Sequence, residues 1–363
     1  MLRIPAAVPR VRCRTDAPTA PPARAPVSPG ALPWTSVSPR PGRGRAARRR
    51  AAARETSPLP PRDGLAPARL RTPPDGPWTT MREHLADRFP HVGPARIDAM
   101  IAAGEIATAA GPLDAATVFT PSTTLWLHRE APDEAEVPFP IEILHADDDV
   151  VVVDKPHFLA TIPRGSHVRQ TVLVRLRHEL GLPELSPAHR LDRATAGVLL
   201  LVKRPELRGA YQTLFADGRV RKTYEALAPH DPALELPRTV TSRIVKRTGV
   251  FAARTEPGVP NAETRIELDT HRDGLARYRL HPRTGRTHQL RVHLSELGVP
   301  ILGDDVYPEL RRRADGDFTR PLQLLSRSLE FDDPVTGLRR RFDSDRTLQA
   351  WDDPAGWAGG TSG

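Results

Sequence analysis

The chain contains a single cysteine in its 363 residues, Cys13, and no long apolar run. A lone cysteine excludes an internal disulfide and is typical of a reducing compartment, so we expect a cytoplasmic protein. The longest apolar runs, such as 198–202, are far too short to span a bilayer, and we expect no membrane contact. These absences leave a soluble protein that is long enough to bury a sizeable core.

Lysine is also scarce, at four residues, so nearly all positive charge comes from arginine. The formal net charge is +9, but residues 1–80 hold fifteen arginines against four acidic residues, and the rest of the chain is close to neutral. Any affinity of that remainder for nucleic acid must therefore come from local basic clusters rather than from a global field.

Residues 1–78 carry 17 of the 40 prolines and show almost no apolar periodicity. Such a segment cannot bury enough surface to offset its ordering entropy, so we expect it to be disordered. Its arginine run over 43–50 is compatible with a solvated RNA-binding tail, and its acid-poor composition with a transit peptide. A third interpretation is a true start further downstream, at Met81, where the first periodic segment begins.

A different pattern begins at residue 79. Apolar residues share one face of a short helix that Pro94 opens and Gly104 ends. Residues 105–108 and 125–127 indicate short strands. This helix, glycine, strand order predicts a small module separate from the larger remainder of the chain.

The stretch AHRLDRATAGVLLLV, 188–202, starts polar and becomes an unbroken apolar run. The run has the length and branching of a buried strand, so it fixes a charged loop to the core. Asp192 lies between two arginines in that loop, and their charge favours its ionised form. Such a carboxylate can be a nucleophile or a base, or it can simply cap a turn and pair with an arginine.

Two further segments have candidate site residues. The strand expected over 219–227 alternates, so Lys222 and Tyr224 share a mostly apolar face. A tyrosine there can stack on a base beside a lysine that reaches phosphate, although core packing explains it equally well. The stretch 281–307 predicts a helix from residue 287 to 297. Arg286 and His288 lie near its N-terminus, where free N–H groups favour anions; its histidine spacing does not fit a zinc helix.

HRLDRATAG resembles the catalytic motif of the RluA-type RNA pseudouridine synthases, where HRLD is followed by Thr-Ser-Gly and an aliphatic strand. K-T-Y and TGRTHQLRVH…GDDVY resemble the second and third motifs of that family, in the right order. The family's serine is Ala196 here, and Leu325 replaces the histidine of its last strand. The resemblance covers roughly residues 141–342. It implies isomerisation of uridine to pseudouridine in ribosomal or transfer RNA, with no metal or cofactor.

The resemblance also implies roles for individual residues. Asp192 is the implied catalytic residue, Tyr224 stacks on the target uracil, and Arg291 forms a salt bridge with Asp192. The target base must be flipped out of any duplex to reach the carboxylate. Contact with RNA or support of the site is assigned to Arg190, Lys222, Arg286 and His288.

Two other classes of protein stay open. A non-catalytic RNA-binding protein built on the same fold would need only the basic clusters, and a carboxylate at their centre would repel phosphate. A glycosidase would need a second carboxylate roughly 5 to 10 Å from the first. Asp304 is the contender for that position, and we interpret it as a turn residue.

The implied fold is α+β, with a mixed, mostly antiparallel sheet flanked by helices and a small, degenerate alpha-L-like module in front. We expect a monomer that binds RNA. The expected division is a disordered tail (1–78), the alpha-L-like module (79–132), a linker (133–140), the catalytic domain (141–346) and a flexible C-terminal tail (347–363).

Overall fold

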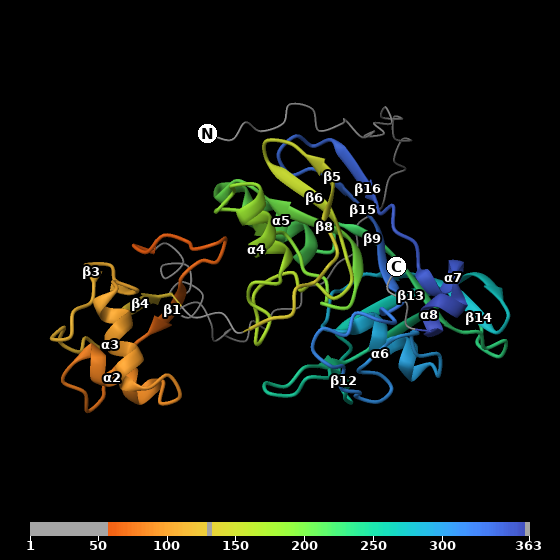
Figure 1. Cartoon of the computed structure of the whole chain (residues 1–363). Coiled ribbons are helices and arrows are strands. Elements are labelled where there is room, and N and C mark those ends of the chain that lie inside the picture. The colour runs from red at the N-terminus through yellow and green to blue at the C-terminus, as the bar shows by residue number, and fades with distance from the viewer. Residues whose placement is uncertain (1–56, 129–132, 360–363) are drawn as a thin grey trace, which may run out of the picture. The chain divides into compact units, whose positions relative to one another are not determined.

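The computed structural model describes residues 57–128 and 133–359 (Figure 1). The described residues form two compact units, one from each of these ranges. The expected disordered tail falls, over residues 1–56, outside the described residues. No helix in the described ranges is long and apolar enough to cross a membrane.

The small unit has two helices and a four-stranded antiparallel sheet around one apolar core. A capping box opens the first helix, because Thr80 accepts the backbone N–H of Glu83 and the Glu83 carboxylate accepts that of Thr80. The face predicted for the second helix is buried. The elements are β1 (Ala68–Arg71), α2 (Met81–Arg88), α3 (Pro94–Ala102), β2 (Ile106–Thr108), β3 (Gly111–Pro112) and β4 (Thr124–Leu127), with strand order β1-β4-β2-β3.

The small unit starts earlier than the expected boundary at residue 78. Strand β1 lies in the supposed tail and pairs with β4. Further upstream, Leu59 is buried with Ala107 and Trp126. The prolines of residues 57–78 are compatible with this folded structure, because all of them lie outside β1, in segments without regular ladder pairing. The boundary is therefore corrected to residue 57, where the described residues begin.

The large unit is built on one ten-stranded sheet, and the expected mixed, mostly antiparallel α+β fold is confirmed. The strand order is β10-β13-β14-β9-β15-β8-β6-β5, with β16 beside β15 and β7 beside β8. Within the described residues, β15 pairs parallel with β8 and the other pairs of this sheet are antiparallel. The strands are β5 (Glu142–Ala146), β6 (Val150–Lys155), β7 (Ser186–Pro187), β8 (Ala196–Val202), β9 (Arg221–Pro229), β10 (Arg238–Ser242), β13 (Ala262–Arg272), β14 (Leu275–Pro282), β15 (Leu324–Asp332) and β16 (Arg339–Asp343).

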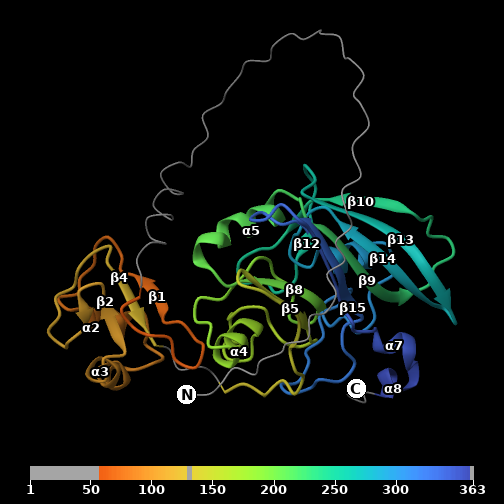
Figure 2. The ribbon, with the colours of Figure 1, turned by 90° about the horizontal axis from the view of Figure 1, so that it is seen from above.

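Helices cover both faces of this sheet. Val151 and Val153 of β6 join an apolar core with α4 and α6, whereas Val150 and Val152 join a second core with α5. Successive side chains of a strand point to opposite faces, so the continuous apolar runs predict this double burial. Figure 2 shows α4 and α5 on opposite sides of β8. The helices are α4 (Val172–Glu179), η1 (Pro205–Leu207), α5 (Arg208–Ala216), α6 (Gln289–Glu296), α7 (Gln349–Asp352) and α8 (Pro354–Gly359).

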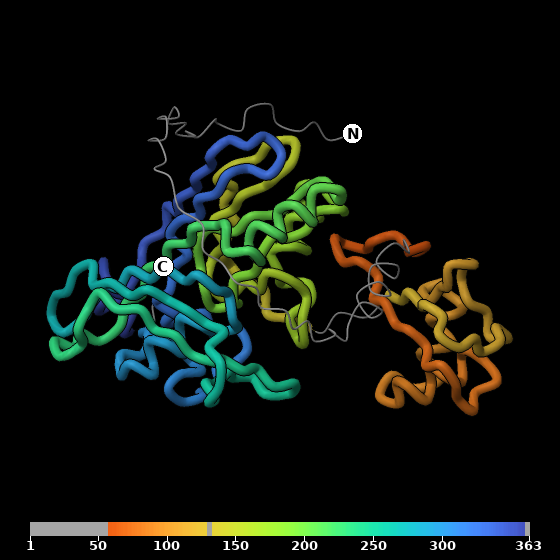
Figure 3. The backbone as a smooth tube through the Cα atoms, turned by 180° about the vertical axis from the view of Figure 1, so that it is seen from behind, coloured from red at the N-terminus to blue at the C-terminus, as the bar shows by residue number. Residues whose placement is uncertain are grey.

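Two hairpins of the large unit lie side by side at one edge. In Figure 3 the β5–β6 hairpin runs beside the β15–β16 hairpin. An ion pair joins them, with Arg340 Nη1 2.7 Å from Asp147 Oδ2. Asp147 also accepts the backbone N–H groups of Asp149 and Val150, which makes the acidic triplet 147–149 a hydrogen-bonded turn.

The C-terminal segment from residue 347 is folded over residues 348–359, and the expectation of a flexible tail is wrong there. Leu348 and Ala350 are buried against the sheet. The guanidinium of Arg272 lies 4.3 Å from the ring centroid of Trp351, a cation–π contact. Trp357 donates its indole N–H to the Pro321 carbonyl. Trp351 and Trp357 thus anchor the segment that was expected to be flexible.

The expected linker is likewise attached to the large unit. The Glu134 carboxylate accepts the backbone N–H groups of Val168, Arg169 and Gln170 at 2.8, 2.8 and 3.0 Å. Val137 is 4% exposed and belongs to the core of the large unit. Residues 133–140 have no regular secondary structure but are packed along the body.

Candidate active site

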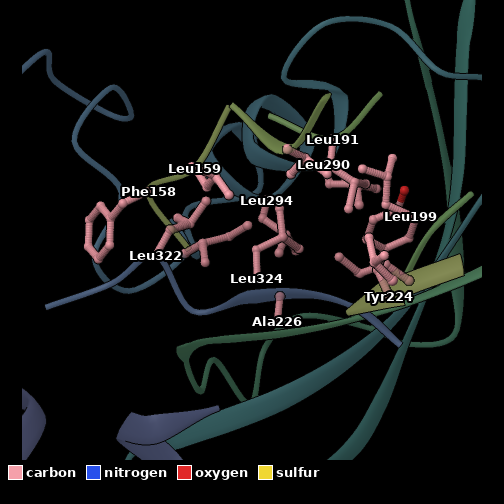
Figure 4. Close-up of a cluster of buried hydrophobic side chains, with 14 of the residues drawn as sticks. Phe158, Leu159, Leu191, Leu199, Tyr224, Ala226, Leu290, Leu294, Leu322 and Leu324 are labelled. Carbon is pink, nitrogen blue, oxygen red and sulfur yellow. The ribbon is translucent and has the colours of Figure 1, made fainter. Parts of the chain in front are cut away.

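One end of the core beneath α4 and α6 brings the three sequence motifs together. Leu191, Leu290 and Tyr224, one from each motif, belong to the same buried cluster. Figure 4 shows Leu191 beside Leu290, with Tyr224 toward the same end of the cluster. Asp192 and Arg291 directly follow two of these leucines, so apolar packing positions both charged groups.

The loop that carries Asp192 is fixed from below. Thr161 Oγ donates to the Leu191 carbonyl at 2.7 Å and accepts the Leu191 N–H at 3.1 Å. Lys155, fully buried at the end of β6, donates to the carbonyls of Leu159 and Arg193 at 2.7 and 3.3 Å. Burial lowers the pKa of Lys155 well below its usual value, and the charge of Asp192 opposes that shift. The loop therefore has a defined backbone before any substrate arrives.

Steric crowding explains why the motif that contains Asp192 has a glycine at position 197. Gly197 has φ of 108°, and a Cβ there would lie 2.3 Å from the backbone oxygen of Ser326. β8 and β15 therefore approach too closely for any side chain at this position. The preceding Ala196 pairs with Leu325 across the same junction, and both are fully buried.

The Asp192 carboxylate is half-buried and has no hydrogen-bond donor among the described residues. Its side chain is 32% exposed, and its ion-pair contact is with His288, whose Nε2 lies 4.0 Å from Oδ2. This separation is longer than a hydrogen bond. A partly desolvated carboxylate with free lone pairs is the arrangement that a base or nucleophile requires.

The expected salt bridge between Arg291 and Asp192 is not formed. Arg291 instead binds Asp304 through two parallel bonds, Nε to Oδ2 at 2.7 Å and Nη2 to Oδ1 at 2.6 Å. Asp304 also accepts the backbone N–H groups of Val306 and Tyr307, which holds its carboxylate in the plane that suits the guanidinium fork. Asp304 is thus the turn residue that the sequence predicted, and the buried partner of Arg291 as well.

Asp192 still acts on Arg291 at longer range. Burial lowers the pKa of Arg291, but the hydrogen bond and charge of Asp304 outweigh it, and the charge of Asp192 adds to the net increase. The side chains of Arg291 and Asp304 are 3% and 1% exposed, so the pair is desolvated. Its strength fixes α6 to the turn at 304–307 and keeps the guanidinium away from the Asp192 carboxylate.

His288 is held in one orientation between Asp192 and Tyr307. Its φ of 57° is left-handed, an uncommon conformation for a residue other than glycine. Its Nδ1 lies 3.0 Å from Tyr307 Oη, and that hydroxyl also lies 2.9 Å from the N–H and 2.8 Å from the carbonyl of Ala253. A hydroxyl has one proton, and Tyr307 donates it in the hydrogen bond to the Ala253 carbonyl. Toward His288 the hydroxyl oxygen can therefore only accept, so we assign the His288 proton to Nδ1.

That assignment leaves Nε2 of His288 as an acceptor that faces Asp192. Burial lowers the pKa of His288, the charge of Asp192 raises it and that of Arg291 lowers it, for a net decrease. The imidazole is therefore neutral near pH 7. Two acceptors 4.0 Å apart can share a donor from a bound substrate, such as a ribose hydroxyl.

Tyr224 lies beside this group at the end of the core. It is 9% exposed and pairs with Ser326 of β15. Burial raises the pKa of its phenol to about 12; a hydrogen bond with Ser326 opposes this, and the charge of Asp192 adds to it. The electrostatic coupling places Tyr224 near Asp192, while its stacking on a uracil stays a prediction.

The other predicted RNA contacts lie further out. Lys222 is 8% exposed and donates to the Thr284 carbonyl at 3.0 Å, so it supports the turn before α6. Burial lowers its pKa to about 8. Arg286 is exposed and donates to the Asn261 carbonyl at 2.9 Å, and Arg190 is exposed with no ion pair in the described ranges.

Sequence reasoning missed two residues of this site. Tyr307 ends the third motif, and its contact with Ala253 joins segments 54 residues apart. Nothing local in the sequence around Lys155 shows that its ammonium donates to the Arg193 carbonyl. Both act through backbone carbonyls and amides, which leave no pattern in a sequence.

Comparison with known proteins gives consistent matches. The family profile described as RNA pseudouridylate synthase matches residues 149–296. Pseudouridylate synthase RPUSD2 of Homo sapiens is 36% identical over 182 residues, or 50% of this chain and 33% of that protein. The dual-specificity RNA pseudouridine synthase RluA of Yersinia pestis is 32% identical over 207 residues, or 53% of this chain and 95% of that protein. A solved structure, Human RNA Pseudouridylate Synthase Domain Containing 4, is 26% identical with a TM-score of 0.43, covering 56% of this chain and 89% of that one.

The extent of these matches differs between relatives. The chain spans about a third of the length of the human and mouse RPUSD2 proteins. It spans nearly all of the Yersinia protein.

Proposed function

This chain belongs to the RluA-type RNA pseudouridine synthase family, and we propose that it isomerises uridine in RNA to pseudouridine, with Asp192 as the catalytic residue. The observation that carries the proposal is the state of the Asp192 carboxylate. It is half-buried, it has no donor among the described residues, and Tyr224 and His288 lie beside it. A structural aspartate would be expected to use its lone pairs within the protein.

The reaction itself explains why one carboxylate suffices. Isomerisation breaks the bond between N1 and C1′ of uridine and forms one between C5 and C1′. The proton on C5 is lost and N1 gains one, so atoms balance without an oxidant, a reductant or a co-substrate. Asp192 is the candidate for the group that attacks or accepts the proton, and the neutral His288 Nε2 is placed to accept a hydrogen bond from the ribose.

The substrate must bring an unpaired base to this carboxylate. A base in a duplex cannot reach Asp192, so the target uridine is flipped out or already in a loop, at a cost of a few kcal/mol for a paired base. Tyr224 would stack on the uracil, and Arg190 would enter the vacated position. We propose ribosomal or transfer RNA as the substrate and a monomer in the cytoplasm as the acting species.

The Arg291–Asp304 pair disfavours the glycosidase interpretation. A second catalytic carboxylate must be available to water or to the sugar. Both oxygens of Asp304 are bound by Arg291, and one of them also accepts two backbone N–H groups. Asp304 thus has a structural function that a glycosidase acid or base would not have.

Release of tritium from RNA labelled at C5 of uridine tests the proposed function. The substrate is a set of unmodified transcripts of the source organism's large ribosomal RNA and transfer RNAs. Wild type should release tritium and Asp192→Asn should not, while both unfold at the same temperature because the Asp192 side chain makes no hydrogen bond within the described residues. Asp148→Asn, which changes an exposed aspartate of the same unit, is the control and should act as wild type.

Two results would count against the proposal. Tritium release by Asp192→Asn would remove Asp192 from the chemistry. RNA binding by wild type with no release from any transcript would favour the non-catalytic RNA-binding alternative.

A further inference from the structure

Between β10 and β13 the chain leaves the sheet as an arm, residues 243–261, that contains the short strands β11 (Ile244–Val245) and β12 (Arg254–Thr255). The arm has a firm base. Asn261 accepts the Ile244 N–H at 2.9 Å and donates to the Ile244 carbonyl at 3.1 Å. Ile244 and Ala253 are buried against Val292 of α6, so the arm is packed on the helix that follows His288.

Tyr307 holds the far part of the arm over the candidate active site. Its hydroxyl binds both backbone groups of Ala253 and lies 3.0 Å from Nδ1 of His288. The arm is therefore joined to the residue that faces Asp192. Its position next to the carboxylate follows from hydrogen bonds and does not depend on a bound ligand.

Phe251 is the exposed aromatic residue of this arm. Phe251 is 63% exposed, so packing in the core does not require an apolar residue at this position. Its ring centroid lies 6.1 Å from that of His288, at an interplanar angle of 61°. Since His288 Nε2 is 4.0 Å from Asp192, the ring lies within the reach of a nucleotide next to the target.

The surroundings of Phe251 suit a nucleobase better than a protein partner. A protein interface needs a contiguous apolar patch of several hundred Å² on each side. The Phe251 ring instead lies beside His288, which faces Asp192. The charge of Lys246 also acts on His288. A single exposed ring with a neighbouring cation is the arrangement by which proteins bind unpaired nucleic acid strands.

We infer that Phe251 stacks on a base of the RNA next to the uridine that enters the active site. Tyr224, on β9, would then contact the target uracil, and Phe251, on the arm, would contact a neighbouring nucleotide. The inference rests on RNA being the substrate, as the proposed function states, but it does not depend on catalysis by Asp192. It assigns to the arm a function in holding the strand open around the flipped base.

The test compares four variants for binding to the same ribosomal and transfer RNA transcripts, with tritium release as the second readout. Phe251→Ala should weaken RNA binding by about 5- to 100-fold, the range that base stacking on an aromatic side chain contributes. Phe251→Trp should bind at least as well as wild type, whereas Phe251→Leu should resemble Phe251→Ala. Val259→Ala, at an 85% exposed apolar residue of the same arm, is the control and should bind as wild type.

Because Phe251 is exposed, its variants should unfold at the wild-type temperature. Wild-type affinity for Phe251→Ala, or equal affinity for the Leu and Trp variants, would overturn the inference. Binding without tritium release by wild type would contradict the proposed function alone, and the comparison of Phe251 variants would still decide the stacking. Absence of binding by wild type to every transcript would overturn both.

Discussion

Nε2 of His288 lies 4.0 Å from Oδ2 of Asp192, and neither atom has a proton to give to the other. Because burial keeps the pKa of His288 below its usual value, the imidazole is neutral near pH 7 and becomes charged only in acid. Protonation of His288 would convert this 4.0 Å contact into an ion pair with the Asp192 carboxylate. The carboxylate would then be engaged by the protein instead of the substrate.

A pH profile of tritium release examines this relationship. We expect the wild-type rate to fall only as the pH passes through the lowered pKa of the folded His288, which lies below the ordinary histidine value of about 6.5. His288→Asn, which tolerates the left-handed backbone, should lose less of its own activity over the same range. Profiles of identical shape would show that His288 does not control the carboxylate.

The Tyr307 hydroxyl offers a second prediction. Tyr307→Phe would leave the N–H and carbonyl of Ala253 and the Nδ1 of His288 without their partner, at a cost of about 1–3 kcal/mol in unfolding free energy. Activity should fall as well, since the arm and His288 lose their mutual support. Tyr278→Phe is a matched control, because its hydroxyl binds the Pro229 carbonyl away from the site.

Urea unfolding of both tyrosine variants, together with their rates of tritium release, separates the two effects. Tyr278→Phe should be destabilised with an unchanged rate at permissive temperature. Equal loss of rate in both variants would assign the effect of Tyr307 to stability alone.

Double-mutant cycles can test the partner of Arg291. Arg291→Gln should lower the unfolding free energy by about 3–5 kcal/mol, because it leaves the buried Asp304 carboxylate without its cation. Asp304→Asn should cost less, because Asp305 Oδ1, 3.2 Å from Nη2, still pairs with Arg291. The double variant should lose far less than the sum of the two. A cycle of Arg291→Gln with Asp192→Asn should give little coupling; a large value there would restore the salt bridge that the sequence predicted.

Acid stability should depend on His293. This side chain is 0% exposed, and its ring nitrogens lie 2.9 Å from Ser242 Oγ and 3.0 Å from Thr264 Oγ1. Burial lowers its pKa to about 4, so between pH 6.5 and 4 the unfolded chain binds a proton that the folded chain does not. Stability should therefore fall as the pH falls through this window, by about 3 kcal/mol in full for this residue.

Chemical unfolding at pH 7 and pH 4.5 measures that loss. His293→Gln, which is neutral at both values, should show a smaller difference between them than wild type. The same difference in both proteins would mean that other buried histidines, such as His189, account for acid unfolding.

Apolar pattern and motif order were enough to predict the body of the fold. The run Val198 to Val202 is a central buried strand because each face of the sheet has its own core, and β9 alternates as expected around Tyr224. The partner of Arg291 is Asp304, which the sequence did not predict. Nothing in the sequence marks which carboxylate Arg291 binds, and the turn at 304–307 orients Asp304 to accept from Nε and Nη2 of its guanidinium.

The boundaries failed for a different reason. Composition at 57–78 and 347–359 is rich in proline, glycine and charge, and these averages hide single anchors such as Leu59 and Trp351. Phe251 has no signal of its own, because an isolated aromatic residue in a loop looks the same whether buried or exposed. Its position near the site depends on Tyr307, 56 residues later, which binds the arm at Ala253.

Ala196 and Leu325 are the two departures from the family pattern that the structure places in contact. They are paired residues of β8 and β15, fully buried in one small cluster. Each change removes a polar side chain from the same spot. An apolar pair is stable there because neither partner leaves an unsatisfied group.

The parallel pairing of β8 with β15 also sets an order of events during synthesis. The loop that carries Asp192 leaves the ribosome well before the strand that closes against Gly197, which contains Ser326 and lies more than a hundred residues downstream. A nascent chain that already has all three motifs still lacks the strand that packs against Gly197 and pairs with the start of β8. Protein halted before residue 324 should therefore bind chaperones rather than RNA, and activity should appear only when the last strand enters the middle of the sheet.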